Sequence, residues 1–462
     1  MAKSIFVCQS CGAEHRKWIG QCPDCGDWNC ISEQLLEANA QRIGSKGKAL
    51  ATSPITEISS LASPRRSSHI QELDRVLGGG IVPGSAVLIG GNPGIGKSTL
   101  LLQAAAKLAA HSKRPVLYIT GEESIQQVHL RGERIESIHE NLLLVSACEL
   151  ESMLATIDQI KPEVVIVDSI QTTVSNRLTS APGTVSQVRD CAAALIQNAK
   201  RIGHALILVG HVTKDGALAG PRVLEHMVDA VIYFEGDNGH EHRILRAVKN
   251  RFGPAGEIGV FEMTDRGLIG IRDASRLFLA ERSLDTPGSV VLACMEGTRP
   301  LLVEVQALVA PTVYSTPKRS AVGLDAGRVA MLTAVLERRI GLPLSQHDVY
   351  INIAGGARIA EPAADLAVLL AMVSAYQEKP VAAEVALFGE VGLTGEVRPV
   401  GQPESRTREA ANLGFTHVIL PGENYRRVQK ANIIAKIRDE IGSTLRMSEV
   451  RHLSDAVQKL LT

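Results

Sequence analysis

The sequence predicts an α/β protein with a central parallel sheet, preceded by a small four-cysteine module and followed by a separate α+β region. Apolar strands alternate with helical segments over residues 61–275, the pattern of a parallel sheet with crossover helices. Four of the eight cysteines fall within the first 25 residues. From about residue 280 the pattern changes again, and a chain of 462 residues is long enough for about three domains.

The composition excludes a strong global attraction to nucleic acid or to membrane. Lys and Arg together number 49, as do Asp and Glu, so the net charge is zero. A site for a polyanion would therefore have to be local. No segment reaches the roughly 18 consecutive apolar residues of a membrane span, and the first residues do not resemble a signal peptide. We expect a cytoplasmic protein that does not contact membranes.

Residues 1–30 have the cysteine spacing of a zinc module. Two C-x2-C pairs are separated by ten residues, and a glycine that permits a tight turn follows each pair. So short a segment cannot bury a sizeable core, so Zn²⁺ binding would supply its folding free energy. The alternative is a pair of redox-active dithiols. The expected zinc ligands are Cys8, Cys11, Cys22 and Cys25.

The partner of this module stays open at the level of sequence, although Lys17, Trp18 and Trp28 could contact DNA or another protein. Residues 31–60 are small and polar and lack a repeated apolar stripe, so they are interpreted as a linker.

The best-defined motif lies in the region 61–275, directly after the apolar strand SAVLIG. It matches G-x4-G-K-[ST] and is followed by an apolar helix, the context of a phosphate-binding P-loop. Its backbone N–H groups would surround the phosphates of ATP, Lys97 would reach the β- and γ-phosphates, and Ser98 would ligate Mg²⁺. The motif consists of Gly91, Asn92, Pro93, Gly94, Ile95, Gly96, Lys97, Ser98 and Thr99.

Polar residues follow the next three predicted strands. Glu122 and Glu123 come after PVLYIT, Asp168 ends EVVIVD, and His211 follows HALILVG. Carboxyl ends of parallel strands share one edge of a sheet, so these side chains are expected beside the P-loop. Asp168 would hold Mg²⁺ through water, and either glutamate could orient the attacking water. The sequence does not choose between the two glutamates, and either alone could be a solvated loop residue.

This arrangement resembles the RecA-like ATPases, and the segment RAVKNRFGPAG extends the resemblance. It places Lys249 and Arg251 two residues apart near the end of a strand. The resemblance implies that this cationic pair enters the ATP site of a neighbouring subunit and stabilises charge on the transferring phosphoryl group. A basic edge strand without such a role is the alternative.

The order of a four-cysteine module, a RecA-like core with KNRFG and the C-terminal region resembles the bacterial DNA repair proteins of the RadA (Sms) family over essentially the whole chain. The resemblance implies a homohexameric, DNA-stimulated ATPase of the helicase type that drives branch migration in homologous recombination. It also implies single-stranded DNA, branched recombination intermediates and a RecA-type recombinase as partners.

Residues 280–462 look like the proteolytic domain of Lon protease, but both members of its catalytic dyad are replaced. In EPAA, Ala363 takes the position of the Lon serine, and in RPVGQPESR, Glu404 takes that of the lysine. Neither side chain can attack a peptide carbonyl or activate a serine, so we expect a catalytically inactive platform. Cations that could contact phosphate there, or could be ordinary surface charges, are Lys318, Arg319, Arg358 and Arg398.

In a RecA-like ring, the loops that leave the third and fourth strands face the channel, which makes them the expected DNA contacts. The first loop offers Arg177, and the second offers Lys214 and Arg222. Neither loop contains an aromatic residue, so contact with the DNA backbone is favoured over base stacking.

Two other classes of function account for less of the chain. An ATP-dependent protease would need the nucleophile that the C-terminal region lacks. A RecA-like switch or phosphotransferase of the clock-protein type shares the tandem glutamates, but it leaves the zinc module and the Lon-like region unexplained.

Overall fold

The protein, as a computed structural model, comprises two compact units, Met1–Ile271 and Arg272–Thr462. The residues that the structure describes are 3–8, 14–23, 26, 28, 31–36, 65–211, 223–236, 242–280, 282–313, 316–442 and 444–461. Among them, no helix combines the length and apolar character that crossing a bilayer requires.

The N-terminal module contains a three-stranded antiparallel sheet of β1 (Lys3–Cys8), β2 (Glu14–His15) and β3 (Ile31–Leu36), in the order β2-β1-β3. Strand β3 pairs along the whole of β1, from Lys3 opposite Leu36 to Cys8 opposite Ile31. The interpretation of residues 31–36 as the start of a linker is therefore wrong. This strand is too short and too polar to show a clear alternating pattern in the sequence. It is defined by its pairing with β1, which lies more than 20 residues earlier in the chain.

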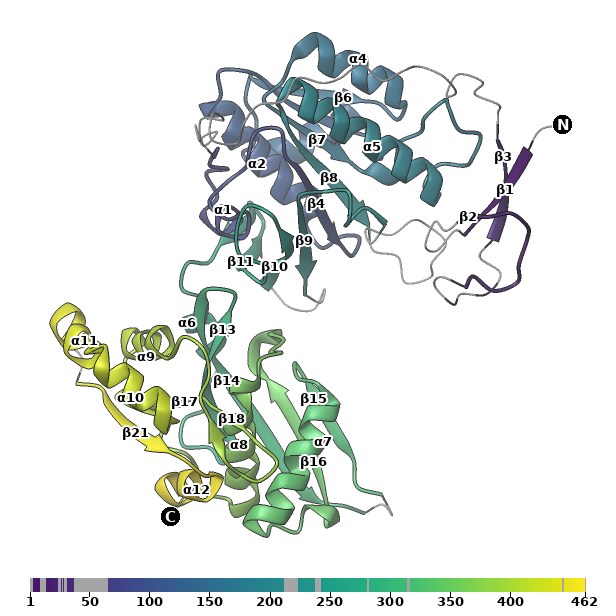
Figure 1. The fold of residues 1–462 in the computed structure, drawn as a ribbon. Coiled ribbons are helices and arrows are strands. Elements are labelled where there is room, and N and C mark those ends of the chain that lie inside the picture. Colours follow the sequence, from purple (N-terminus) through teal and green to yellow (C-terminus); the bar gives the residue numbers. More distant parts are fainter. Residues whose placement is uncertain are drawn as a thin grey trace, which may run out of the picture. The chain divides into compact units, whose positions relative to one another are not determined.

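The core of the first unit is a nine-stranded sheet in the order β12-β11-β10-β9-β4-β8-β7-β5-β6 (Figure 1). The strands from β4 to β9 pair in parallel with one another, as predicted. Their bounds are β4 (Ala86–Gly91), β5 (Val116–Thr120), β6 (Leu142–Ser146), β7 (Val164–Asp168), β8 (Ala205–His211) and β9 (Ala230–Glu235).

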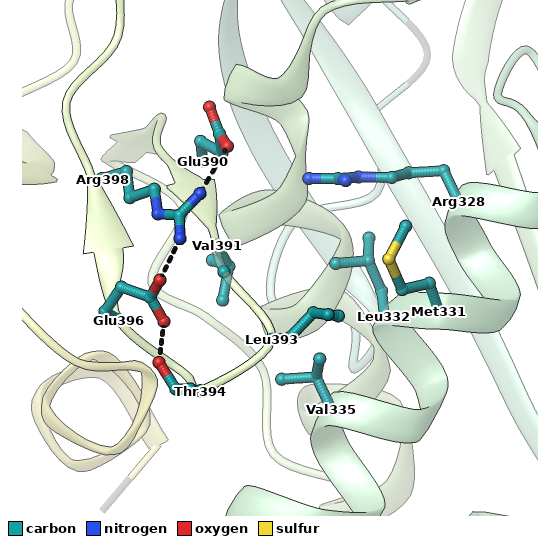
Figure 2. Close-up of a pocket in the computed structure, with 11 residues that line it drawn as sticks. Arg328, Met331, Leu332, Val335, Glu390, Val391, Leu393, Thr394, Glu396 and Arg398 are labelled. Atoms are coloured by element: carbon teal, nitrogen blue, oxygen red, sulfur yellow. Dashed lines mark hydrogen bonds and ion pairs between the residues drawn. The ribbon is translucent and has the colours of Figure 1, made fainter.

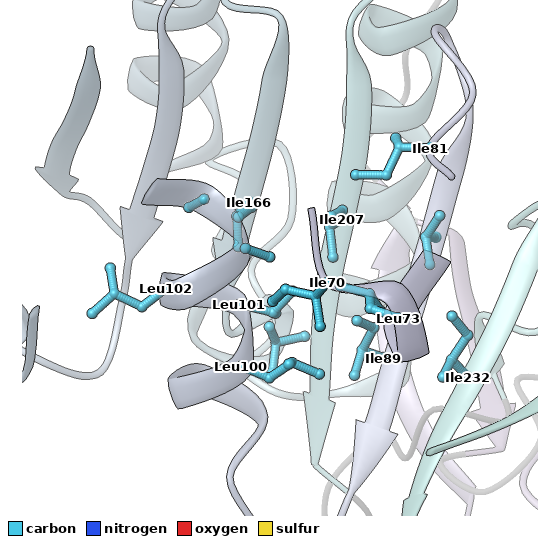
Figure 3. Close-up of a cluster of buried hydrophobic side chains, with 14 of the residues drawn as sticks. Ile70, Leu73, Ile81, Ile89, Leu100, Leu101, Leu102, Ile166, Ile207 and Ile232 are labelled. Carbon is cyan, nitrogen blue, oxygen red and sulfur yellow. The ribbon is translucent and has the colours of Figure 1, made fainter. Parts of the chain in front are cut away.

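Both faces of this sheet are covered, which explains why its strands are apolar without interruption. In β8, Ile207 and Val209 pack into one buried cluster, whereas Leu206 and Leu208 pack into the other. The first cluster, part of which Figure 3 shows, includes Leu100 and Leu101 of α2. The covering helices are α1 (Gln71–Val76), α2 (Lys97–His111) and α3 (Ile125–Arg134) on that face, with α4 (Leu150–Ile160) and α5 (Val185–Ile202) on the other.

Beyond β9 the sheet continues as an antiparallel meander. It consists of β10 (His242–Asn250), β11 (Ile258–Thr264) and β12 (Gly267–Gly270). The chain then enters the second unit at Arg272, so residues 272–275, predicted as the end of the core, belong to the C-terminal unit. Ser275 shows why: its hydroxyl donates to Glu409 and accepts a hydrogen bond from Leu302 N, both in that unit.

His204, directly before β8, is fully buried in the first unit. Neither ring nitrogen has a hydrogen-bond partner among the described residues. Burial, reinforced by the nearby Arg114 charge, lowers the pKa of His204 from 6.5 to about 4. The imidazole is therefore neutral in the folded protein near pH 5, where an unfolded chain would bind a proton.

This difference predicts a loss of stability in acid. Because the folded-state pKa is depressed, the free energy of unfolding falls as the pH decreases from about 6.5 to about 4, by about 3 kcal/mol in all. Urea unfolding at pH 7 and at pH 4.5 measures the loss, which should be smaller for His204→Phe. His129→Gln serves as the control, because His129 is 54% exposed. Equal pH dependence in all three proteins would contradict the prediction.

The second unit contains a seven-stranded mixed sheet in the order β15-β16-β14-β13-β17-β20-β21 (Figure 1). Its strands are β13 (Ser289–Glu296), β14 (Arg299–Pro311), β15 (Arg319–Val322), β16 (His347–Ile353), β17 (Val385–Leu387), β20 (His417–Pro421) and β21 (Arg446–Val450), and a small separate hairpin joins β18 (Glu390–Val391) to β19 (Val397–Arg398). Its helices are α6 (Ala274–Leu279), α7 (Ala326–Val335), α8 (Asp365–Gln377), α9 (Pro403–Asn412), α10 (Gly422–Lys430), α11 (Ile433–Ile441) and α12 (Leu453–Leu461).

Helix α8 forms the centre of this unit. Its residues from Asp365 to Ser374 are all buried, as expected for a helix that is apolar on every side. The turn that precedes it contains Pro362, whose fixed φ suits a helix start. The α+β prediction for this region is confirmed by its mixed sheet and helices.

Candidate active site

The P-loop joins β4 to α2, and Lys97 is the first residue of that helix. The Lys97 side chain is almost completely buried, and its Nζ donates to Gly91 O at 2.8 Å and to Asn92 O at 2.9 Å. Burial lowers the pKa of Lys97 to about 8, although the nearby carboxylates of Asp168 and Glu122 act in the opposite direction. A buried ammonium group at a helix N-terminus is suited to bind phosphate.

Two glycines of the motif are required by close packing. A Cβ atom at Gly91 would lie 2.9 Å from Phe234 Cβ, and one at Gly96 would lie 2.8 Å from Met263 Cε. Gly96 also has a φ of 116°, which L side chains rarely adopt. A side chain at position 91 would therefore collide with β9, and position 96 requires glycine mainly because of its backbone conformation.

Asp168 ends β7 and is 7% exposed. Its Oδ2 accepts a hydrogen bond of 2.5 Å from the hydroxyl of Tyr118, which lies on the neighbouring strand β5. Burial and the Asp168 charge raise the pKa of Tyr118 well above its usual value, so the phenol stays protonated and remains a donor. Sequence reasoning missed Tyr118, although a hydroxyl within an otherwise apolar strand was a visible signal.

Glu122 follows β5 and faces two polar neighbours. Its Oε1 accepts a 2.5 Å hydrogen bond from Ser169 Oγ and lies 3.1 Å from His211 Nε2. The contact with His211, together with the Ser169 bond, lowers the pKa of Glu122 to about 2. The structure thus brings Glu122 and His211 together as predicted, and it adds Ser169, which the sequence reasoning overlooked.

Glu123 has different contacts, although it is the next residue. Its carboxylate pairs with Arg131 of α3, and its backbone N–H donates to Thr120 Oγ1. Glu122, by contrast, contacts Ser169 and His211. It also lies close enough to the P-loop lysine Lys97 for the two charges to interact. The structure therefore distinguishes two residues that the sequence could not.

Lys249 and Arg251 both contact the segment Glu225–Asp229. Lys249 Nζ donates to the carbonyls of Glu225 and Val228 at 2.7 and 2.9 Å. Arg251 Nη1 lies 3.0 Å from Asp229 Oδ1, with its side chain 57% exposed. A β-bulge between Ala247 and Lys249 interrupts the strand register, yet both cations lie against the same segment.

Of the three expected DNA contacts, Arg177 is exposed in the segment between β7 and α5. Its backbone N–H donates to Ser175 Oγ at 3.4 Å. Lys214 and Arg222 lie outside the described residues.

In the N-terminal module, Cys8 and Cys22 are fully buried in one small cluster with Ile31, and neither is in a disulfide. Gly26 N donates to Cys22 O at 2.8 Å, which forms the tight turn expected after a metal-binding cysteine pair. Cys11 and Cys25 lie outside the described residues. The two described thiols fit the predicted zinc site.

In the C-terminal unit, the two positions predicted to correspond to the Lon dyad have the following surroundings. Ala363 is buried in the turn Pro362–Ala364, and Glu404 pairs with Arg427 at 3.2 Å. A second ion pair lies next to them: Arg406 Nη1 and Nη2 donate to the Glu361 carboxylate at 2.8 and 2.6 Å. Sequence reasoning missed this pair, because nothing along the chain indicates that these two residues meet.

A cavity of about 330 Å³ lies in the same unit, between α7 and the β18–β19 hairpin (Figure 2). Its wall includes Arg398, which pairs with Glu396 at 2.5 Å and Glu390 at 3.5 Å (Figure 2). Among the described residues that line it there is no Ser, Cys, His or Lys. Of the other cations expected to contact phosphate, Arg319 donates to the carbonyls of His347 and Leu344, whereas Lys318 and Arg358 are exposed.

Each of the three parts of the chain matches a known protein family. Residues 52–217 match an AAA domain, residues 333–462 match the C-terminal proteolytic domain of Lon protease (S16), and residues 6–33 match a rubredoxin metal-binding domain. The fold and site therefore define an AAA-type P-loop ATPase that uses ATP and Mg²⁺, joined to a metal-binding ribbon suited to zinc and to a Lon-like domain.

Curated relatives identify the family. The DNA repair protein RadA of Listeria monocytogenes is 51% identical over 421 residues, which cover 91% of this chain and 92% of the relative. RadA of Bacillus subtilis is 50% identical over 427 residues (91% and 93%), and RadA of Pseudomonas aeruginosa is 50% identical over 423 residues (91% and 93%). The chain belongs to the RadA family of DNA repair proteins.

Proposed function

We propose that this protein is a DNA-dependent ATPase motor that binds single-stranded DNA and drives branch migration of recombination intermediates as a homohexameric ring in the cytoplasm. The observation that carries the proposal is the convergence of Lys97, Glu122, Asp168 and His211 in a P-loop core of a RadA family member. A RecA-type recombinase would act on the same intermediates.

The P-loop residues would bind and orient ATP. Backbone N–H groups of the P-loop would surround the phosphates, and Lys97, which donates to the carbonyls of Gly91 and Asn92, would bind the β- and γ-phosphates instead. Ser98 and Asp168 would hold Mg²⁺, which neutralises phosphate charge when bound. Tyr118, which donates to Asp168 Oδ2, keeps that carboxylate oriented and leaves its other oxygen available.

Glu122 is the better candidate for the residue that orients the attacking water. While it contacts His211 and Ser169, the Glu122 carboxylate is ionised but weakly basic, because these two residues stabilise its negative charge. His211 also ends β8, directly before the segment with the expected DNA contacts Lys214 and Arg222. We infer that DNA binding to that segment moves His211 and releases Glu122, which would couple DNA to hydrolysis.

The C-terminal domain would act as a scaffold and DNA-binding platform without peptidase activity. Ala363 has no nucleophilic atom, and Glu404 is already paired with Arg427. Of the cations expected there, Lys318, Arg358 and Arg398 are exposed, and Arg398 already pairs with Glu396 and Glu390. Lys318 and Arg358 are therefore the better candidates for phosphate contact.

ATP turnover by the purified protein, measured with and without single-stranded DNA, tests the motor assignment. We expect DNA to raise turnover and a three-strand branch-migration assay to show extension that requires ATP. Lys97→Ala should abolish both activities, because the buried ammonium no longer reaches the phosphates. DNA-independent turnover, or hydrolysis by Lys97→Ala, would contradict the proposal.

The cationic pair predicts complementation between subunits. If Arg251 acts across a subunit boundary, mixed rings of Arg251→Ala and Lys97→Ala chains should recover part of the ATPase activity that each variant lacks alone. Some interfaces would then combine an intact P-loop with an intact arginine. Mixing Lys97→Ala with Lys97→Arg provides the control. Absence of recovery in rings verified to be mixed would indicate that Arg251 acts within its own subunit.

A further inference from the structure

The N-terminal module exposes two large aromatic side chains that neither the ATPase site nor the zinc site uses. Trp18 is 58% exposed and Trp28 is 71% exposed. They are the only two tryptophans of the chain. An indole ring contributes a large apolar surface, so two exposed rings in one small module indicate a contact surface.

The two rings lie on the same part of the module. A Cβ atom at Gly20 would lie 3.8 Å from Trp18 Cη2 and 3.9 Å from Trp28 Cζ3. Trp28 also pairs as an isolated bridge with Gln21, whose Nε2 donates to Gly26 O at 2.8 Å. Both indole rings therefore lie beside Gly20, which has no side chain to separate them.

Charge accompanies the aromatic rings. Arg16 and Lys17 directly precede Trp18, and both side chains are exposed. Neighbouring cations and flat aromatic faces are the combination that binds single-stranded nucleic acid, since phosphates contact the cations and bases stack on the rings. The expected DNA loops of the core lack aromatic residues, so they cannot supply this stacking.

We propose that Trp18 and Trp28 form a stacking site for bases of single-stranded DNA, with Arg16 and Lys17 contacting the adjacent phosphates. This inference rests on the proposed function as a DNA motor. It assigns base contact to the zinc module and leaves backbone contact to the core loops.

Tryptophan emission of the full-length protein provides a direct measurement, because all of it comes from these two residues. A fluorescently labelled thymidine oligonucleotide measures affinity by anisotropy, and an abasic oligonucleotide of equal length offers the same phosphates without bases. We expect the thymidine oligonucleotide to quench the emission and to bind more tightly than the abasic one.

Substitution of either tryptophan should remove the difference in affinity between the thymidine and the abasic oligonucleotide. Trp18→Ala and Trp28→Ala should each weaken binding of the thymidine oligonucleotide by about 5-fold to 100-fold, while binding of the abasic oligonucleotide stays unchanged. Trp18→Phe should retain much of the affinity, because phenylalanine also stacks. An unchanged zinc content of one ion per chain shows that each variant module is folded.

The outcomes separate this inference from the proposed function. Normal DNA binding and DNA-stimulated ATPase activity in both alanine variants, with no quenching in the wild type, would overturn the stacking site and leave the motor intact. Loss of recombinase binding with unchanged oligonucleotide affinity would also overturn it, because the surface would then serve a protein. Absence of all DNA binding by the wild type would instead contradict the proposed function.

Discussion

Glu122→Gln is expected to reduce ATP turnover by about 10²-fold to 10⁴-fold, the usual contribution of a general base. Glutamine keeps the size of the side chain and can still accept a hydrogen bond from Ser169, but it cannot take a proton from water. Binding of a fluorescent ATP analogue should be preserved, because Lys97 and the P-loop backbone are unchanged. Steady-state turnover and equilibrium nucleotide binding measure the two effects separately.

Glu123→Gln is the matched control. It makes the same chemical change one residue away, at a carboxylate that pairs with Arg131 rather than with Ser169 and His211. We expect turnover within a few-fold of the wild type. A large loss in Glu123→Gln with activity retained in Glu122→Gln would reverse the assignment of the base.

Arg406→Met should destabilise the C-terminal unit by about 3–5 kcal/mol, the typical cost of removing one member of a buried ion pair. The Arg406 side chain is 3% exposed and also donates to the carbonyls of Ala293 and Gly401. Methionine fills a similar volume but leaves the Glu361 carboxylate without its cationic partner, while the hydrogen bond from Met295 N to that carboxylate remains. Urea unfolding followed by circular dichroism measures the change.

Two further variants show whether charge causes this loss. In Glu361→Gln with Arg406→Met, no unpaired charge remains, so part of the stability should return. Arg408→Ala removes the more exposed pair with Glu440 and should cost less than about 1 kcal/mol. Equal losses for Arg406→Met and Arg408→Ala would contradict a special role of the buried pair.

The expected architecture follows from local sequence. Apolar strands between helices indicated a parallel sheet with crossover helices, and in the structure the buried residues of β8 divide between clusters on its two faces. The P-loop could be recognised because its chemistry needs glycine, lysine and a hydroxyl at fixed spacing. The predicted replacement of the Lon dyad likewise rests on residue identity at two positions.

The tertiary structure decided which polar side chains meet. Glu122 and Glu123 are equivalent along the chain, but β5, β7 and β8 bring Ser169 and His211 to the first and leave the second to Arg131. Glu361 and Arg406 are 45 residues apart, and their contact arises only from folding. Strand β3 was likewise hidden, because it is defined by its pairing with β1. Local patterns determine elements and motifs, whereas contacts between distant residues depend on the packing of the whole unit.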